Sequence, residues 1–278
     1  TLGGAGHTTA ILDAHPGLSV LGLDRDPAAL AASRERLAPY GDRVMLQHRR
    51  FDDLDAAMSE AGIDELSGAL FDLGVSSHQF DSGERGFSYR HDAPLDMRMD
   101  TTEATTAADV VNQASEIEIA QILREYSDEK FAGRIARAIV SARPIHTTSE
   151  LADIVASAIP APARRRGGHP AKRTFQALRI SLNKELEILP NAIDSAVRRT
   201  SSGGRVAVLS YHSGEDRIIK ARFKQHATGG CECPSQLPCG CGAQRTVRLV
   251  RVASKPSAVE QEKNPRSTSA RLRVAEVI

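Results

Sequence analysis

Glycines near the start of the chain are followed by acidic residues that end two apolar stretches. Residues 1–8 read TLGGAGHT, Asp24 ends the apolar stretch 19–23, and Asp72 ends the stretch 68–71. Glycine lets the backbone approach a ligand more closely than a side chain would allow. An acid at the end of a strand can accept hydrogen bonds from both hydroxyls of a ribose. The glycine cluster alone is equally typical of a tight turn, but together with the acids it predicts a nucleoside-binding site.

The spacing of the glycines distinguishes between two nucleoside cofactors. The dinucleotide fingerprint G-x-G-x-x-G is not met, because Thr9 stands where the third glycine counted from Gly4 would fall. The cradle for a pyrophosphate is therefore incomplete, which argues against a nicotinamide-dependent dehydrogenase. S-adenosylmethionine has no phosphates and does not need this cradle. The pattern favours a methyl donor.

The elements that must position these residues alternate between strands and helices. Short apolar stretches predict buried parallel strands at residues 19–23, 43–47 and 68–71. Helices are expected between them, at 26–37, where Asp26 and Pro27 supply an N-cap and a first-turn proline, and at 52–61. This order predicts a doubly wound parallel sheet with helices on both faces. A strand normally precedes a turn such as residues 1–4, so we expect that the first strand is missing from this chain.

Helical signals then interrupt the alternation. Residues 78–100 are polar without a clear period, which predicts a long functional loop. Residues 107–159 contain two capping boxes, and leucines from Leu178 to Leu189 recur at helical spacing. Residues 205–210 resume the strand pattern. A helical block is therefore inserted into one α/β domain.

We accordingly predict a Rossmann-like α/β methyltransferase domain formed by residues 1–100 and 187–278. A helical domain at residues 101–186, for recognition of the substrate, is expected to be inserted into it.

Composition limits the remaining possibilities. With 278 residues, 41% hydrophobic and 26% charged, the chain has the composition of a globular protein. No apolar run approaches the length of a membrane span and no signal peptide is evident, so a cytoplasmic protein with no membrane partner is expected. The sequence leaves the oligomeric state open, a homodimer included.

Basic residues are concentrated although the net charge is only +1. The best candidates for contacts with RNA phosphates are Arg164, Arg165, Arg166, Lys172, Arg173 and Arg179. A solvated charged face is the alternative interpretation. Arg245, Arg248 and Arg251 form a second such patch or the outer side of a helix or strand.

Five long motifs occupy residues 72–77, 79–88, 94–100, 169–180 and 210–217, and a short one occupies residues 264–266, in order over nearly the whole chain. Together they resemble the bacterial 16S rRNA cytosine-N4 methyltransferases of the MraW type. The resemblance implies S-adenosylmethionine-dependent methylation of the exocyclic N4 amine of a decoding-centre, P-site cytidine in 16S rRNA. The implied partner is the small ribosomal subunit. Against the family pattern, Gly214 stands where a leucine is usual, and the junction at Arg143 and Pro144 looks short.

The resemblance also implies a set of cofactor contacts, which fall on Ala5, Gly6, His7, Asp24, Phe51, Asp72 and Gln79. In these positions Asp24 would bind the ribose and Phe51 would pack against the adenine. Asp72 and Gln79 would lie near the methionine end and the target base.

Methyl transfer from a sulfonium needs alignment and exclusion of water rather than a metal. Cytosine N4 is a poor nucleophile, and a carboxylate that accepts its hydrogen bond would help it and later take the proton. Asp72 is the leading candidate for this catalytic role; the alternatives are that it caps a turn or binds the amine of the donor. His212 is expected to position the base, with a structural role as the alternative. A Ser-His-acid hydrolase is disfavoured because no G-x-S-x-G elbow is present.

Two further groups of residues are candidates for contacts with the substrate and with a metal. On the loop 78–100 the residues expected to hold a flipped nucleotide are Arg85, Phe87, Arg98 and Asp100, a solvated loop network being the alternative. A thiol cluster that suits tetrahedral zinc is formed by Cys231, Cys233, Cys239 and Cys241, although C-x-C spacing is tighter than usual for zinc. Free thiols are the alternative interpretation of these cysteines.

Two other functions are compatible with the α/β fold. An amino-methyltransferase acting on DNA usually carries an Asp/Asn/Ser-Pro-Pro-aromatic motif, which the segment beginning at Asp72 lacks. A non-catalytic ribosome-assembly module that kept the fold would not bind the methyl donor.

Overall fold

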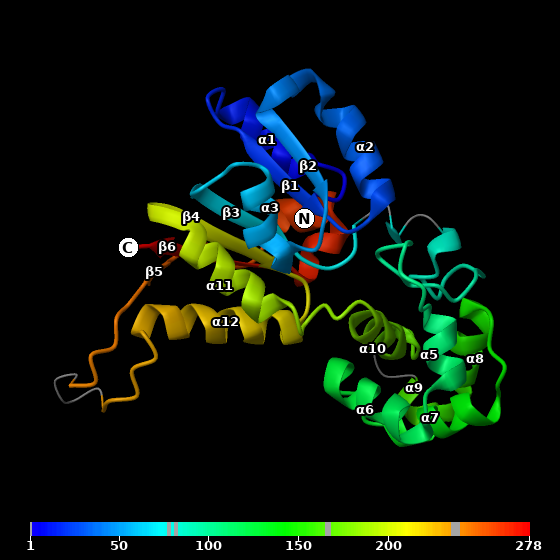
Figure 1. Cartoon of the computed structure of the whole chain (residues 1–278). Helices are drawn as coiled ribbons and strands as arrows, with labels where there is room; N and C mark the ends of the chain where they lie inside the picture. Colours follow the sequence, from blue (N-terminus) through cyan, green and yellow to red (C-terminus); the bar gives the residue numbers. More distant parts are fainter. Residues whose placement is uncertain (1, 77–78, 81–82, 165–167, 235–239) are drawn as a thin grey trace. The chain divides into compact units, whose positions relative to one another are not determined.

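The chain forms two compact units (Figure 1). The computed structural model describes residues 2–76, 79–80, 83–164, 168–234 and 240–278. The sheet unit consists of Thr1–Gly74 and Leu186–Ile278, and the helical unit consists of Val75–Glu185. The division after Gly74 lies earlier than the expected boundary at residue 100. The reason is that apolar side chains from this stretch, namely Phe87, Leu95, Met97 and Met99, belong to the core of the helical unit.

The first part of the sheet unit has the predicted alternation. It contains helix α1 (Gly6–Ala14), strand β1 (Val20–Asp24), helix α2 (Pro27–Leu37), the 3-10 helix η1 (Ala38–Arg43) and strand β2 (Val44–His48). β1 and β2 are parallel, with Asp24 paired to His48. The predicted start of α2 is confirmed, because the side chain of Asp26 accepts a hydrogen bond from the amide of Ala28 at 3.0 Å.

The second part of the sheet unit is a four-stranded sheet with helices packed on it. Its elements are η2 (Phe51–Asp53), α3 (Leu54–Glu60), β3 (Leu66–Asp72), α11 (Leu189–Arg199), β4 (Thr200–Ser210), α12 (Ser213–Thr228), β5 (Val247–Val250), α13 (Ala258–Lys263), η4 (Pro265–Ser269) and β6 (Arg271–Val277). The strand order is β3-β4-β6-β5. α11 and α12 run along one side of this sheet (Figure 1) and bury Ile193, Ala196, Ile219 and Phe223.

The parallel pairing predicted for the early strands does not extend to the last strand of the sheet unit. β3 and β4 are parallel, but β6 is antiparallel to both β4 and β5. Parallel neighbours need a crossover that covers a face of the sheet, usually by a helix. The connection from β5 to β6 contains α13, which has no buried residue and covers no face. β6 therefore lies beside β5, the strand before it in the chain, and runs in the opposite direction.

The helical unit consists of short helices around an apolar core. They are α5 (Ala107–Gln113), α6 (Glu116–Ser127), α7 (Ala132–Ser141), α8 (Thr148–Ala158), α9 (Ala161–Arg164) and α10 (Lys172–Leu182), and the 3-10 helix η3 (Gly83–Arg85) precedes them. Both predicted capping boxes are confirmed, at Ser115 and Thr147. Among the described helices of the chain, none is long and apolar enough to cross a membrane.

The run of leucines at helical spacing does not form one helix. α10 ends at Leu182, and Lys184 has a left-handed backbone with φ of 52°. The side chain of Asn183 forms two long-range hydrogen bonds, accepting from the amide of Met99 at 2.8 Å and donating to the carbonyl of Met97 at 2.9 Å. These bonds hold the end of α10 against the loop before α5, and α11 begins only at Leu189.

Candidate active site

The start of α1 borders open space in the sheet unit. Ala5 precedes the helix with φ of 57°, is fully buried, and provides no side-chain cap for the first-turn amides. A Cβ added at Gly4 or Gly6 would have no atom within 4 Å, so the space beside both glycines is open, as predicted. The N-terminus of a helix carries partial positive charge and suits a carboxylate.

Asp24 holds the glycine turn at the end of β1. Its Oδ2 accepts hydrogen bonds from the amides of Leu2 and Gly3, both at 3.0 Å, and its Oδ1 accepts one from the amide of Asp26 at 2.9 Å. Because a carboxylate oxygen can accept two hydrogen bonds, Oδ1 has capacity for a ligand hydroxyl. Asp24 can therefore fix the turn and contact a ribose with the same carboxylate.

Asp72, at the end of β3, connects α1 to the segment after β4. His7 Nδ1 lies 3.4 Å from Asp72 Oδ2, and the hydroxyl of Tyr211 donates to Asp72 Oδ1 at 2.8 Å. Asp24 and Asp72 therefore contact the same short stretch, residues 2–7. This convergence of the glycine turn and both acids is the arrangement that the sequence predicted.

The charges of this cluster are set by its hydrogen bonds. Burial alone would raise the pKa of Asp72, but the hydrogen bonds from His7 and Tyr211 outweigh it and the pKa is lowered. The hydrogen bond to Asp72 raises the pKa of His7 above its ordinary value of 6.5, against the opposing effect of burial. Burial and the negative charge of Asp72 raise the pKa of Tyr211. At neutral pH the site therefore contains an ionised carboxylate and a neutral phenol that donates to it.

Tyr211 is the functional candidate that the sequence analysis missed. It lies inside the recognised motif 210–217, immediately after β4, but received no role. Its position after a strand end was the available signal, since Asp24 and Asp72 were identified by the same criterion.

His212 has the contacts of a helix cap. It is the N-cap of α12, and its Nδ1 accepts from the amides of Gly214 at 3.2 Å and Glu215 at 3.5 Å. Glu215 completes a capping box by accepting from the amide of His212 at 3.2 Å, and it also accepts from the amide of Tyr211 at 2.7 Å. His212 Nε2 lies 3.3 Å from Glu215 Oε1, but the two atoms do not form a hydrogen bond. Nε2 is therefore buried without a hydrogen-bond partner. These contacts give His212 a structural role, and its catalytic role stays a prediction.

The two remaining cofactor candidates have defined contacts within their own units. In the sheet unit, Phe51 packs edge-on against Phe71, with the ring centroids 5.8 Å apart. In the helical unit, Gln79 is 5% exposed and its side-chain oxygen accepts from the amide of Ser76 at 2.9 Å. Contacts of Phe51 with adenine and of Gln79 with the donor stay predictions.

The loop residues assigned to a flipped nucleotide stabilise the loop itself. Arg85 donates to the carbonyls of Arg98 and Met99, and Arg98 forms a two-point ion pair with Asp96 at 2.9 and 2.7 Å. Phe87 is 6% exposed and belongs to the core of the helical unit. In this structure Phe87 therefore has no face on which a base could stack.

Asp100 also has a partner within the loop. Its Oδ1 accepts hydrogen bonds from the amide and the hydroxyl of Thr102, at 2.9 and 2.6 Å. For these side chains the alternative interpretation, a network within the loop, describes the contacts observed.

The predicted phosphate contacts divide into two kinds. Arg164, Lys172 and Arg173 are exposed on the helical unit. Arg179 instead forms a two-point ion pair with Glu185, at 2.8 and 3.0 Å, and both side chains are largely buried. Arg179 is thus committed to this pair rather than presented to RNA. Arg165 and Arg166 lie outside the described residues.

Three of the four cysteines meet in the sheet unit. The sulfurs of Cys231, Cys233 and Cys241 all lie within 4.8 Å of one another. None of the three forms a disulfide. Cys239 lies outside the described residues.

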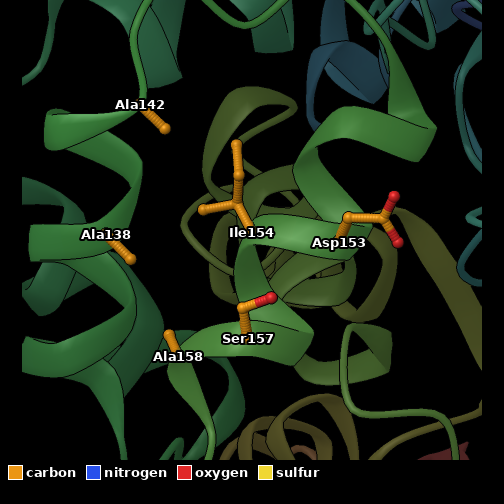
Figure 2. A pocket seen from close by; sticks show the side chains of 6 residues that line it. All are labelled: Ala138, Ala142, Asp153, Ile154, Ser157 and Ala158. Atoms are coloured by element: carbon orange, nitrogen blue, oxygen red, sulfur yellow. The ribbon is translucent and has the colours of Figure 1, made fainter.

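A depression of about 450 Å³ on the helical unit shares no residue with this cluster of acids (Figure 2). It lies between α7 and α8 and is lined by Ala138, Ala142, Asp153, Ile154, Ser157 and Ala158. Four of these side chains are Ala or Ser, and Asp153 is the single ionisable group, so the lining offers little that could do chemistry.

Fold and site together define a class of protein: a Rossmann-like α/β enzyme with a nucleoside-type site at its strand ends. A family model described as the MraW methylase family matches residues 1–278. The ribosomal RNA small subunit methyltransferase H of Mycobacterium sp. (strain KMS) is 52% identical over 280 residues, which cover 100% of this chain and 75% of that protein.

The protein of the same name from Thermobifida fusca (strain YX) is 52% identical over 279 residues, covering 99% of this chain and 84% of the relative. The one from Heliobacterium modesticaldum is 51% identical over 287 residues, covering 100% and 91%. The chain belongs to the MraW methylase family and is a methyltransferase.

Proposed function

We propose that this protein transfers a methyl group from S-adenosylmethionine to the N4 amine of a decoding-centre, P-site cytidine in 16S rRNA. The observation that carries the proposal is the convergence of Asp24 and Asp72 on the open glycine turn at residues 2–7. The relatives at about half identity are named as methyltransferases of small-subunit ribosomal RNA. The choice of N4 on a cytidine rests on the motif resemblance.

The residues present fit the proposed donor. When bound, S-adenosylmethionine supplies an electrophilic methyl group on a positively charged sulfur. The uncapped amides of α1 suit its carboxylate, and the open space beside Gly6 admits it. Asp24 Oδ1 retains capacity for a ribose hydroxyl. No pyrophosphate cradle is required.

Asp72 has the charge needed for an electrostatic role. Because its pKa is lowered, it stays ionised at neutral pH and is a weak general base. We infer that its carboxylate accepts a hydrogen bond from the target amine, and that Tyr211 and His7 hold it in place for this. The proton acquires acidity only as the amine becomes cationic, so a weak base suffices to take it.

RNA binding is proposed for the exposed cations of the helical unit. Arg164, Lys172 and Arg173 are suited to phosphate oxygens because they are exposed and lie in one stretch of the chain. Phosphate contacts position a nucleic acid without reading its sequence. Their replacement by alanine should weaken binding to small-subunit RNA and reduce the salt dependence of that binding.

The test uses purified small subunits from a strain that lacks the gene. The protein is incubated with tritiated S-adenosylmethionine, and the RNA is digested to nucleosides for mass spectrometry. We expect label in N4-methylcytidine and its loss with Asp72→Asn. Label in another nucleoside would contradict the assignment of N4, and transfer at a normal rate by the Asp72→Asn variant would contradict the role of Asp72.

A further inference from the structure

The loop between α12 and β5 has no apolar core to hold it. In residues 231–234 and 240–246, the parts of the loop that the structure describes, no residue is buried. A segment of this kind gains little from the hydrophobic effect. Small segments without a sufficient apolar core are usually stabilised by disulfides or metals. Three thiols nevertheless gather within it.

The base of the loop is well anchored. The amide of Gly230 donates to the carbonyl of Gln225, and the amide of Thr246 donates to the carbonyl of His226, both at 3.0 Å. Gly229 has φ of 63°, and a Cβ at this position would collide with the backbone of Gln244. The two arms of the loop, residues 230–234 and 240–246, therefore lie in contact at their base. Cys231 and Cys233 in the first arm are thereby brought near Cys241 in the second.

We propose that Cys231, Cys233 and Cys241 bind a zinc ion that cross-links the two arms of this loop. Their sulfurs all lie within 4.8 Å of one another. Two thiolates on a tetrahedral zinc, each about 2.3 Å from the metal, are about 3.8 Å apart, so only small movements are needed. A disulfide requires about 2.05 Å between sulfurs and uses two cysteines, which leaves the third without a role.

The chemistry of the donors selects the metal. Thiolates are soft ligands that suit zinc rather than magnesium or calcium. Each thiol loses its proton when its bond to zinc forms, so binding releases protons and no oxidant or reductant is needed. The site is structural, because methyl transfer from a sulfonium has no step for a metal.

The fourth zinc ligand is not His226, the nearest histidine along the chain. Its Nδ1 is paired with the hydroxyl of Thr246 and its Nε2 with Asp194, both at 2.9 Å. Both ring nitrogens are therefore engaged at the base of the loop. Cys239 is outside the described residues, so its contribution is decided by experiment.

The test measures metal on the reduced full-length chain. After treatment with a chelator and a reductant, the protein is loaded with zinc chloride, desalted and analysed by mass spectrometry for metal content. We expect one zinc per chain. With cobalt chloride in place of zinc we expect the thiolate-to-metal charge-transfer absorption of a tetrahedral site. Absence of bound zinc, or of this absorption, overturns the proposal without any variant.

Variants identify the ligands. Cys231→Ser, Cys233→Ser and Cys241→Ser are each expected to lose zinc during desalting, and the triple variant to bind none. Ala243→Ser introduces the same hydroxyl into the same loop and should retain one zinc. Retention of zinc by the triple variant would overturn the assignment. Cys239→Ser reports whether a fourth thiol takes part.

A second readout follows the loop itself. Arg245 is exposed near the base of the loop and is a site for trypsin. Zinc is expected to slow cleavage after Arg245 and a chelator to restore it, in the parent protein but not in Cys233→Ser. Equal cleavage with zinc and with chelator in the parent protein would contradict a cross-link.

Discussion

Replacing Tyr211 by phenylalanine removes one hydroxyl from the cluster around Asp72 and leaves the ring in place. The hydroxyl donates to an ionised carboxylate at 2.8 Å, and a hydrogen bond to a charged group contributes about 1.5–3 kcal/mol. The Asp72 side chain is 33% exposed, so water can replace part of this bond and the lower end of the range applies. We therefore expect a loss of about 1.5 kcal/mol in stability, or about 3–6 °C in Tm.

The same bond should matter for methyl transfer. If Tyr211 holds Asp72 against the target amine, Tyr211→Phe lowers the transfer rate by up to about tenfold, the equivalent of 1.4 kcal/mol. The pKa of Asp72 should also rise toward its ordinary value, since a donor that lowers it is removed. The assays are tritium transfer to small subunits, thermal melting, and a carboxyl-carbon NMR titration.

Tyr40→Phe is the matched control. The hydroxyl of Tyr40 donates to Asp13 at 2.6 Å, but this pair is exposed and takes no part in the cluster. We expect a smaller change in Tm and an unchanged rate of transfer. Wild-type values for the rate and for the Asp72 titration in Tyr211→Phe would refute the reasoning.

The pH dependence of the cluster follows from His7 and Asp72. A raised pKa in the folded state means that His7 contributes stability below its unfolded pKa of about 6.5, lost as pH rises through the folded value. The lowered pKa of Asp72 means that its contribution is present above about 3.8 and lost as pH falls through its folded value. The pair therefore stabilises between these limits. Asp72→Asn should remove this dependence and lower the pKa of His7 in an imidazole NMR titration; a His7 pKa that stays raised would contradict the pairing.

Three further substitutions test the site and its supports. Gly6→Ala should leave the fold intact or stabilise it by about 0.4–1 kcal/mol. Because its methyl group enters the space proposed for the donor, it should weaken donor binding about tenfold in calorimetry. Gly17→Ala, which is also in open space, should leave donor binding unchanged. His212→Ala removes the cap of α12 and should lower the folding stability by about 1 kcal/mol in thermal melting. His212→Asn keeps a capping side chain and should melt and transfer methyl groups like the parent protein. Slow transfer by the asparagine variant at normal Tm would indicate a catalytic role. Glu185→Gln should remove the negative charge that balances the largely buried Arg179, at a cost of about 3 kcal/mol in urea unfolding. An unchanged midpoint would contradict the importance of this pair.

Local signals predicted the first half of the sheet unit well. β1, α2 and β2 follow from short apolar runs and from the pair Asp26 and Pro27, whose effects act within a few residues. β6 was not predicted, and the segment of β5 was left open between a helix and a strand. Their residues mix charged and apolar types, and their strand conformation comes from pairing with distant partners.

The same division holds in the site. Asp72 and His7 were both expected near the cofactor, and their side chains lie 3.4 Å apart. The partner of Asp72 on its other side, Tyr211, is 139 residues away in sequence. Phe87 was expected on a substrate loop because residues 78–100 are polar and have no clear period. Its burial depends on Leu95 and Met97, which turn inward in the folded helical unit. Packing of this kind is a property of the tertiary structure that a charge pattern does not reveal.

The position of β6 gives the end of the chain an importance beyond its length. Arg271–Val277 lies between β4 and β5, so its loss leaves both neighbours with unpaired edges. On the ribosome, a nascent chain that has not yet released this strand displays β4 as a template for pairing with other chains. Loss of residues 271–277 should therefore favour pairing of β4 with other chains over folding of the sheet unit.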